Sequence, residues 1–258
     1  MSSTSGGIIV IVFISIALYN ALELLILILL RFNHYQSLYF WSLLLSNILG
    51  VIPTSVGTSL EFFALAPLWL SLTISNIGFC FMVPGQSVVL YSRLHLVSQN
   101  YKALLLLRYL ILLDTALLII PSITLNFGSE YILTPPWKMG YSTMERIQVT
   151  WFSAQETLIS GIYIVETVKM IRLSPEGDKR RIKILYELLA LNLVAIAMDI
   201  SLIVLEYMGF YFLQIILKGT VYSVKLKMEF AVLGLLVSIV SVPLPTTGLE
   251  MQRSDNCF

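Results

Sequence analysis

Residues 184–209 read ILYELLALNLVAIAMDISLIVLEYMG, an apolar run long enough to cross a lipid bilayer as a helix. The run nevertheless contains Asn192, Asp199 and Glu206, which hydrocarbon rejects. These three residues stand seven apart, so in a helix they fall within about 20° of one another and form one polar stripe. The remaining positions are almost all Leu, Ile, Val, Ala and Met, which leaves no outward polar face. The pattern therefore predicts a membrane helix whose stripe faces other helices.

The composition extends this prediction to the whole chain. The 258 residues are 57% hydrophobic and 12% charged, with a mean hydropathy of +0.86, which is typical of a chain dissolved mainly in lipid. A net charge of +1 argues against nucleic acid as a partner and leaves the lipid bilayer as the expected one. The two cysteines, Cys80 and Cys257, make neither a disulfide framework nor a cysteine metal site. We expect no metal ion and no cofactor.

Hydrophobic runs bounded by turn signals predict an all-α, polytopic membrane bundle of seven transmembrane helices. We expect one transmembrane domain over residues 1–245 and a cytosolic tail over residues 246–258. The longest connection is predicted over residues 126–146, where Gly128 and Pro135 are among the turn signals. The predicted spans are 8–30, 38–57, 65–92, 103–125, 147–171, 184–209 and 218–241.

Lysine and arginine are unequally divided between the two predicted sides of the membrane. Lys138, Arg146 and Lys218 belong to one side, whereas eleven of the sixteen basic residues belong to the other. Because basic residues concentrate on the cytosolic side, we expect the N-terminus outside or in the lumen and the C-terminus in the cytosol. The expected location is the endoplasmic reticulum membrane. The eleven are Arg31, Arg93, Lys102, Arg108, Lys169, Arg172, Lys179, Arg180, Arg181, Lys183 and Arg253.

Three carboxylic acids near the middle of separate predicted spans are the candidate catalytic residues. Asp114, Glu156 and Asp199 lie at similar depth in the fourth, fifth and sixth spans, so they can converge on one cavity. Intramembrane acids are rare and mark functional sites. An unpaired carboxyl in an apolar cavity stays protonated and can donate a proton. Asp199 is the first choice as donor because its helix is otherwise apolar.

Four further polar residues form the predicted substrate-binding set: Asn192, Gln155, Glu229 and Lys225. Asn192 shares the stripe of Asp199 and can help to orient a substrate oxygen. Lys225 and Glu229 are four residues apart on one helix face, so we expect them to pair, which keeps both charges in a low-dielectric interior. A structural ion pair is the leading interpretation of these two residues, and a direct role in binding is the alternative.

Three stretches carry a resemblance to a known family: VPGQSVVLYSRLHLV at 83–97, QETLISGIYIVETVK at 155–169 and VYSVKLKMEFAVLG at 221–234. They resemble a family of seven-span integral membrane proteins of filamentous fungi. Small multi-span proteins of this general kind in fungal meroterpenoid pathways include membrane-bound terpene cyclases. Those enzymes cyclise a farnesyl or epoxyfarnesyl chain attached to an aromatic or polyketide head. No catalytic residue is carried over from them.

The residues of this chain suit such chemistry. Cyclising a polyprenyl chain without loss of diphosphate requires a strong proton donor, which a carboxylic acid kept neutral by an apolar cavity can supply. No DDxxD-type run for magnesium and diphosphate occurs in the chain. We therefore expect a membrane-bound terpene cyclase of the isomerase or lyase type, acting by protonation on a lipophilic prenylated or epoxyprenylated meroterpenoid precursor. Other enzymes of the same secondary-metabolic pathway are its expected protein partners.

Other classes of membrane protein compete with this interpretation. A heptahelical receptor or sensor without enzymatic activity has the same topology, but no D/E-R-Y run or N-P-x-x-Y run is found where such receptors carry them. A microbial rhodopsin needs a lysine in the seventh span, and Lys225 or Lys227 would serve, but the third predicted span, 65–92, holds no carboxylate as counterion. A transporter or a scaffold is the remaining alternative.

Overall fold

The computed structural model describes residues 3–31, 38–97, 101–132, 134–173, 179–209 and 211–240. The regular structure in these ranges is helical throughout, as the sequence predicts. It forms seven rods, because α2, the π-helical segment η1 and α3 follow one another without interruption. The elements are α1 (Ser3–Arg31), α2 (Leu38–Leu45), η1 (Ser46–Val51), α3 (Ile52–Phe62), α4 (Leu68–Val97), α5 (Tyr101–Tyr131), α6 (Pro135–Leu173), α7 (Lys179–Tyr207) and α8 (Tyr211–Val240).

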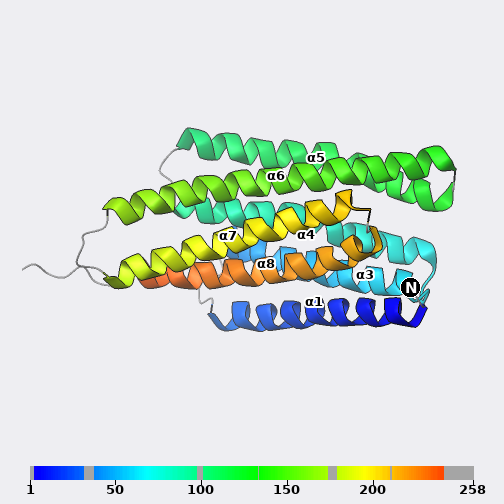
Figure 1. Cartoon of the computed structure of the whole chain (residues 1–258), viewed down its shortest axis with the longest axis horizontal. Helices are drawn as coiled ribbons and strands as arrows, with labels where there is room; N and C mark the ends of the chain where they lie inside the picture. Colours follow the sequence, from blue (N-terminus) through cyan, green and yellow to red (C-terminus); the bar gives the residue numbers. More distant parts are fainter. Residues whose placement is uncertain are drawn as a thin grey trace, which may run out of the picture.

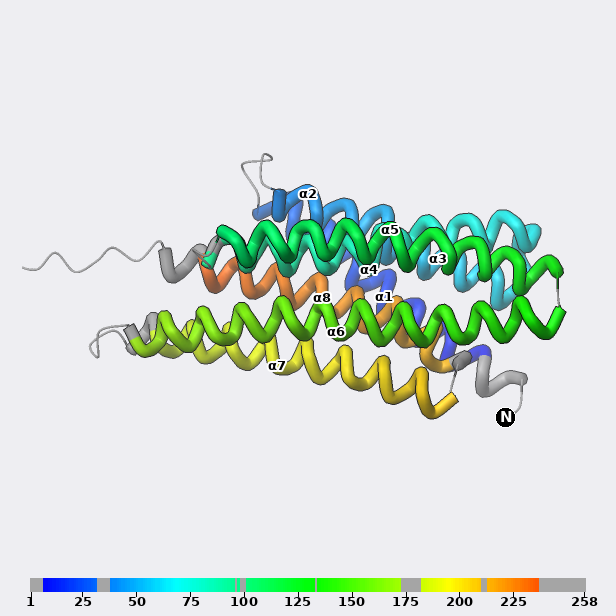
Figure 2. Tube along the Cα trace, turned by 90° about the horizontal axis from the view of Figure 1, so that it is seen from above, coloured from blue at the N-terminus to red at the C-terminus, as the bar shows by residue number. Residues whose placement is uncertain are grey.

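The rods lie side by side along one axis, and consecutive rods run in opposite directions (Figures 1 and 2). Helix α4 contacts α2, η1, α3, α5, α6 and α8, so it occupies the middle of the bundle. Helix α1 packs along α8, which places the first and last described helices next to each other. We call the end where α1 begins the N-terminal end of the bundle, and the end where α1 finishes the far end.

The bundle is apolar outside and polar within. Leu106 and Ile120 of α5 are 68% and 67% exposed, whereas Arg93 of α4 and Lys225 of α8 are each 1% exposed. This distribution is the reverse of a soluble protein and fits a bundle surrounded by lipid. Five stretches are long and apolar enough to cross a membrane: Gly7–Arg31, Leu38–Phe62, Leu68–His95, Tyr101–Tyr131 and Ile182–Tyr207.

The rod formed by α2, η1 and α3 approaches α4 too closely for side chains to fit between some backbone positions. At four glycines, an added Cβ atom would lie only 2.4 to 2.7 Å from an atom of the opposite helix. Small residues permit this kind of close packing between membrane helices. We call these positions the glycine seam. Its members are Gly50 against Met82, Gly57 against Ser75, Gly78 against Thr54 and Gly85 against Ser46.

The prediction of a long connection over residues 126–146 is wrong, because α5 continues to Tyr131 and α6 already begins at Pro135. Two prolines open α6, and the first turn of a helix is the place where proline fits. Gly128 lies inside α5, where a Cβ atom would be 2.1 Å from the ring of Trp137. Residues that resemble turn signals therefore serve helix initiation and close packing.

The other predicted spans overlap the observed rods, with boundaries that differ by several residues. Pro53 lies in the first turn of α3, directly after η1, and α3 continues through it. Helix α8 begins at Tyr211 instead of residue 218, which places Lys218 two turns inside the helix. The tail predicted over residues 246–258 lies outside the described residues.

Candidate functional site

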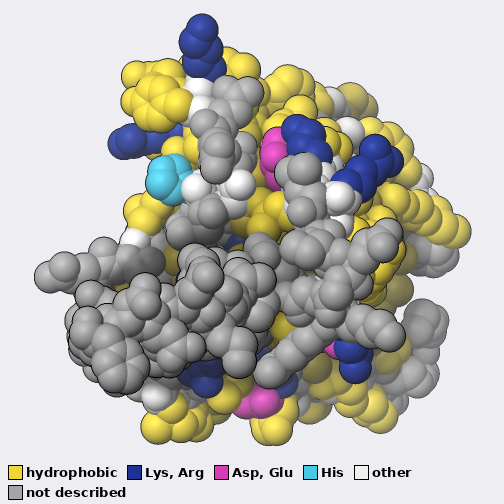
Figure 3. All heavy atoms as spheres, turned by 90° about the vertical axis from the view of Figure 1, so that its left-hand side faces the viewer, with side chains coloured by type: hydrophobic (Ala, Val, Ile, Leu, Met, Phe, Trp, Pro, Cys, Tyr) yellow, Lys and Arg dark blue, Asp and Glu magenta, His cyan; other side chains and the backbone are white. Residues whose placement is uncertain are grey.

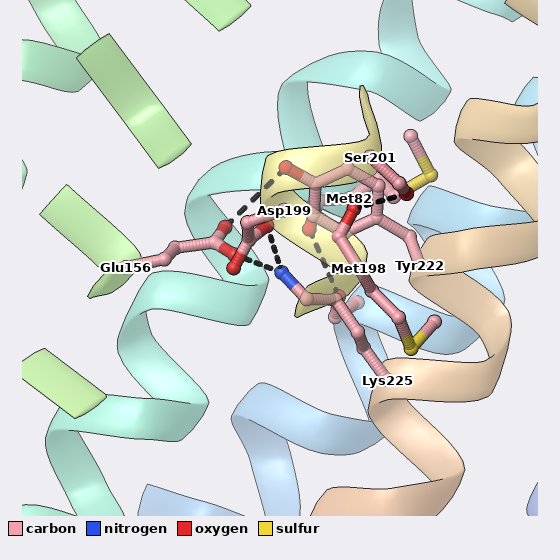
Figure 4. A network of polar contacts seen from close by, with 8 residues as sticks. Met82, Glu156, Met198, Asp199, Ser201, Tyr222 and Lys225 are labelled. Atoms are coloured by element: carbon pink, nitrogen blue, oxygen red, sulfur yellow. Dashed lines mark hydrogen bonds and ion pairs between the residues drawn. The ribbon is translucent and has the colours of Figure 1, made fainter. Parts of the chain in front are cut away.

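Lys225 of α8 is the centre of a buried polar cluster (Figure 4). Its Nζ lies 2.5 Å from Oε2 of Glu156 on α6 and also contacts Oδ1 of Asp199 on α7. Tyr222, almost one turn before Lys225, donates its hydroxyl to Oε1 of Glu156 at 3.3 Å. All four residues are buried. We call Lys225, Glu156 and Asp199 the acid–lysine triad.

The triad contains two carboxyl groups and one cation. If both acids were ionised, one negative charge would be uncompensated in a region of low dielectric, which is costly. A single proton on either Glu156 or Asp199 removes that charge and leaves one lysine–carboxylate pair. The triad is therefore chemically able to hold one proton and to exchange it between two neighbouring acids.

The polar stripe of α7 brings Asp199 to this position. Asn192, Asp199 and Glu206 are 1%, 2% and 3% exposed, so the prediction that the stripe faces other helices is confirmed. Each member meets a basic residue from another helix: Asn192 meets Arg93, and Asp199 meets Lys225. Oε1 of Glu206 lies 3.7 Å from Nε of Arg146 on α6.

A second cluster surrounds Arg93 of α4, nearer the far end. Its Nη1 lies 2.7 Å from Oε2 of Glu229, and its Nη2 donates to Oδ1 of Asn192 at 2.5 Å. The guanidinium carbon also lies 4.1 Å from the ring centroid of Tyr163, a cation–π distance. We call these four residues the arginine cluster. It joins α4, α6, α7 and α8 through one buried side chain.

A third pair lies towards the N-terminal end. Nζ of Lys218 on α8 is 3.2 Å from Oε1 of Glu145 on α6, and it stands 5.1 Å from the ring centroid of Phe79 on α4. Both charged residues are less than 10% exposed. Glu145 and Lys218 line a pocket of about 190 Å³. This pair therefore connects the buried interior with a cavity.

The three groups follow one another along the bundle axis. Lys218 and Lys225 are seven residues apart on α8, or about 10 Å, and Glu229 lies about 6 Å beyond Lys225 at 1.5 Å per residue. Between the first two is a small cavity of about 10 Å³, lined among others by Gln148, Lys218 and Tyr222. This volume is close to the lower limit for one water molecule. Most of the lining of this cavity is apolar, with Phe79, Val83 and Phe152 among the members, so mainly apolar side chains separate the pocket from the triad along α8.

The family model described as "Domain of unknown function (DUF7703)" matches residues 1–245. The chain belongs to the DUF7703 family. The match includes all three groups of buried charges, so they lie in the part of the chain that defines DUF7703. No curated protein and no solved structure matches the chain. Membership of the DUF7703 family shows neither a fungal origin nor a relation to terpene cyclases. Both remain predictions from the sequence.

In this DUF7703 member, two of the three predicted catalytic acids meet. Glu156 and Asp199 share Lys225, which was predicted as a substrate-binding residue. The predicted pairing of Lys225 with Glu229 is wrong, because Glu229 pairs with Arg93 instead. The physical reason is that Arg93 and the two acids offer partners from neighbouring helices, and a guanidinium suits a buried carboxylate better than an ammonium does.

Two predicted site residues lie outside these contacts. Asp114 is buried in α5, and its Oδ2 has no hydrogen-bond partner among the described residues. Gln155 is buried in α6, and neither of its amide atoms has a hydrogen-bond partner within the described part of the chain. Gln155 precedes Glu156, and successive residues of a helix point about 100° apart. Asp114 and Gln155 thus share no hydrogen bond or ion pair with the triad.

Four residues of these buried clusters were not predicted as site residues: Arg93, Glu145, Lys218 and Tyr222. Arg93 and Lys218 were counted as basic residues near the membrane surface, but both are buried. The seven-residue spacing of Lys218 from Lys225 repeats the spacing of the α7 stripe, and this signal would have placed Lys218 inside the bundle. Nothing in the local sequence identifies Arg93 as an inward-facing residue.

Proposed function

We propose that all seven rods of this DUF7703 protein cross the membrane, with the N-terminus outside or in the lumen and the C-terminus in the cytosol. Rods α6 and α8 run alongside the five apolar spans (Figure 1). Their buried charged residues are Glu145, Glu156, Lys218, Lys225 and Glu229. Basic side chains gather at the far end (Figure 3). Of the described basic residues exposed near a bundle end, six lie at the far end and two, Lys138 and Arg146, lie at the N-terminal end. The six are Arg31, Lys102, Arg108, Lys169, Arg172 and Lys183.

A reporter fused to the C-terminus tests this topology. In sealed microsomes of the endoplasmic reticulum, the expected membrane, added protease should digest the reporter. Protection of the reporter until detergent is added would contradict the proposed orientation.

We propose further that the protein transfers protons through the centre of the bundle. The observation that carries this proposal is the acid–lysine triad, in which two buried acids compete for one lysine. Intramembrane acids and lysines that are paired, buried and aligned along the bundle are the usual elements of proton pathways. Purely structural pairing would need only one acid for Lys225, so the second acid is the feature that favours proton transfer.

The proposed proton route begins at the pocket, passes the triad and continues to Glu229 towards the far end. Protons enter from the pocket at Glu145 and Lys218 and pass the small cavity beside Tyr222. They reach the triad through the hydrogen bond between Tyr222 and Glu156. Glu229 lies one turn beyond Lys225 and is the next acid towards the far end. Arg93 holds Glu229 in place and sets how readily this acid accepts a proton.

The variant Asp199→Asn tests this proposal cleanly. It removes the excess acid but leaves Lys225 and Glu156 as a balanced pair, so the variant should fold and accumulate normally. In proteoliposomes loaded with a pH-sensitive dye, an external acid pulse should acidify the interior faster with the unchanged protein than with Asp199→Asn. Glu166→Gln is the matched control, because Glu166 pairs with the exposed Lys169 and has no ion pair with the triad among the described residues. Equal rates for the unchanged protein, Asp199→Asn and empty liposomes would overturn the proposal.

Protonation-initiated cyclisation of a prenylated or epoxyprenylated substrate in a fungal meroterpenoid pathway is the second candidate. The acid–lysine triad supports this function as well, because one of its two acids has no cation of its own and can donate a proton. The small cavity beside Tyr222 does not hold a prenyl chain, so this function requires the helices to separate around the substrate. Microsomes fed such substrates should return a cyclised product, and Asp199→Asn microsomes should return the substrate unchanged. Unchanged substrate in both samples would exclude this candidate.

A further inference from the structure

The pocket at the N-terminal end has the features of a separate ligand site. It has a volume of about 190 Å³, well above the roughly 10–15 Å³ that one water molecule needs. Side chains from α1, α3, α4, α5, α6 and α8 line it. The lining combines aromatic side chains with carboxyl, amide and hydroxyl groups, which is the usual make-up of a small-molecule site.

Two buried side chains in the pocket each have one polar atom without a hydrogen-bond partner among the described residues. Glu145 is 4% exposed; its Oε1 accepts from Lys218, and its Oε2 has no hydrogen-bond partner among the described residues. Gln148, almost one turn later on α6, is 2% exposed. Its Oε1 accepts from Ser122, while its Nε2 has no partner within the described residues. Because such groups are costly to leave unsatisfied, the pocket offers one acceptor and one donor to a ligand.

The charge of the lining selects the class of ligand. The charged residues that line the pocket are Glu61, Glu145 and Lys218, which sum to one negative charge. Lys218 is already engaged by Glu145 and by the ring of Phe79. Glu61 is exposed at the rim. The remaining field is therefore negative, and the aromatic faces in the lining attract cations as well.

We propose that this pocket binds a small primary amine that also carries a hydrogen-bond acceptor, as an amino alcohol does. The ammonium group donates to Oε2 of Glu145 and faces Glu61, and the hydroxyl oxygen accepts from Nε2 of Gln148. The site shares Glu145 and Lys218 with the proposed proton entry, but none of its charged lining residues belongs to the triad, so amine binding does not require proton transfer.

Calorimetric titration of the detergent-solubilised protein with 3-amino-1-propanol tests the proposal. Binding is expected for this amine and not for 1,3-propanediol or propionate, which lack the ammonium group. Glu145→Gln should weaken binding by at least about 30-fold, because a buried charged partner is lost. Glu61→Gln should weaken it by about two- to fivefold, as loss of an exposed charge does. Glu166→Gln, which changes an acid near the far end that does not line the pocket, should bind like the unchanged protein.

Several outcomes would overturn the proposal. Equal binding of the amine and the diol would show that charge plays no role. Absence of amine binding to the folded, unchanged protein would show that the pocket is not an amine site. Glu145→Gln can lose folding because Lys218 loses its partner, so Glu61→Gln is the second variant: wild-type affinity in Glu61→Gln would contradict the assigned role of the negative rim. Asp199→Asn should bind the amine normally, which separates failure of this site from failure of proton transfer.

Discussion

Helix α4 is held against its neighbours by opposite means along its length. Over residues 75–85, the glycine seam brings the backbone of α4 close to the rod formed by α2, η1 and α3. Nearer the far end, Arg93 reaches Glu229 of α8 and Asn192 of α7 through a long charged side chain. Lipid provides no hydrophobic force between helices, so close packing and polar contacts must hold a membrane bundle together. The glycine seam should therefore be sensitive to added atoms, and the buried charged clusters to a lost partner.

The largest effect is expected when the buried charged clusters lose the cation of the triad. Lys225→Met leaves Glu156 and Asp199 without a cation and should destabilise the fold by about 3–5 kcal/mol. The triple variant Lys225→Met, Glu156→Gln, Asp199→Asn carries no charge there and should recover most of that loss. Thermal unfolding of purified protein in detergent measures both. Equal losses in the single and triple variants would show that charge balance does not govern this site.

A smaller effect is expected from one added methyl group in the glycine seam. In Gly78→Ala, the new Cβ atom would lie 2.4 Å from the backbone nitrogen of Thr54, so α3 and α4 must separate at a cost of about 1–3 kcal/mol. Gly161→Ala in α6 is the control, since a Cβ there meets nothing within 4 Å and alanine favours the helix. The same thermal measurement compares them. If Gly78→Ala is as stable as Gly161→Ala, the seam is not closely packed.

The smallest effect is expected from a charge pair outside both regions. Lys169 and Glu166 are 3.0 Å apart near the far end, and the side chain of Lys169 is 59% exposed. Pairs of this type contribute less than about 0.5 kcal/mol. Glu166→Gln should therefore unfold at nearly the same temperature as the unchanged protein. A loss comparable to that of Lys225→Met would mean that exposure does not distinguish the two kinds of pair.

The sequence predicts the helices well because a helix in contact with lipid needs a long run of apolar residues, which is visible in the local sequence. Long apolar runs identify the rods, and the seven-residue spacing of Asn192, Asp199 and Glu206 identifies the inward face of α7. The connection around Gly128 and Pro135 was mispredicted because the same residues end helices, begin them or permit close contact. Which of these roles applies depends on Trp137, a partner that is near in sequence but whose position only the fold determines.

The candidate site is predicted only in part for a different physical reason. Charge and burial indicate which residues need a partner, but they do not indicate the partner. Lys225 and Glu229 satisfy the local rule for pairing on one helix face, yet Arg93 is more than a hundred residues from Glu229 in sequence. The choice depends on how α4, α6 and α7 surround α8, and a single helix carries no information about that arrangement.

The charges of α8 also bear on the order in which the membrane receives the chain. Lys218, Lys225, Lys227 and Glu229 fall within residues 218–229, and α8 is not among the five stretches apolar enough to span alone. Each such group costs about 2.5–3.5 kcal/mol at the middle of an isolated inserting helix. The ribosome completes α6 and α7 first, so Glu156 and Asp199 are synthesised before Lys225. In the proposed seven-span topology, α8 therefore inserts next to acids that can pair with its lysine.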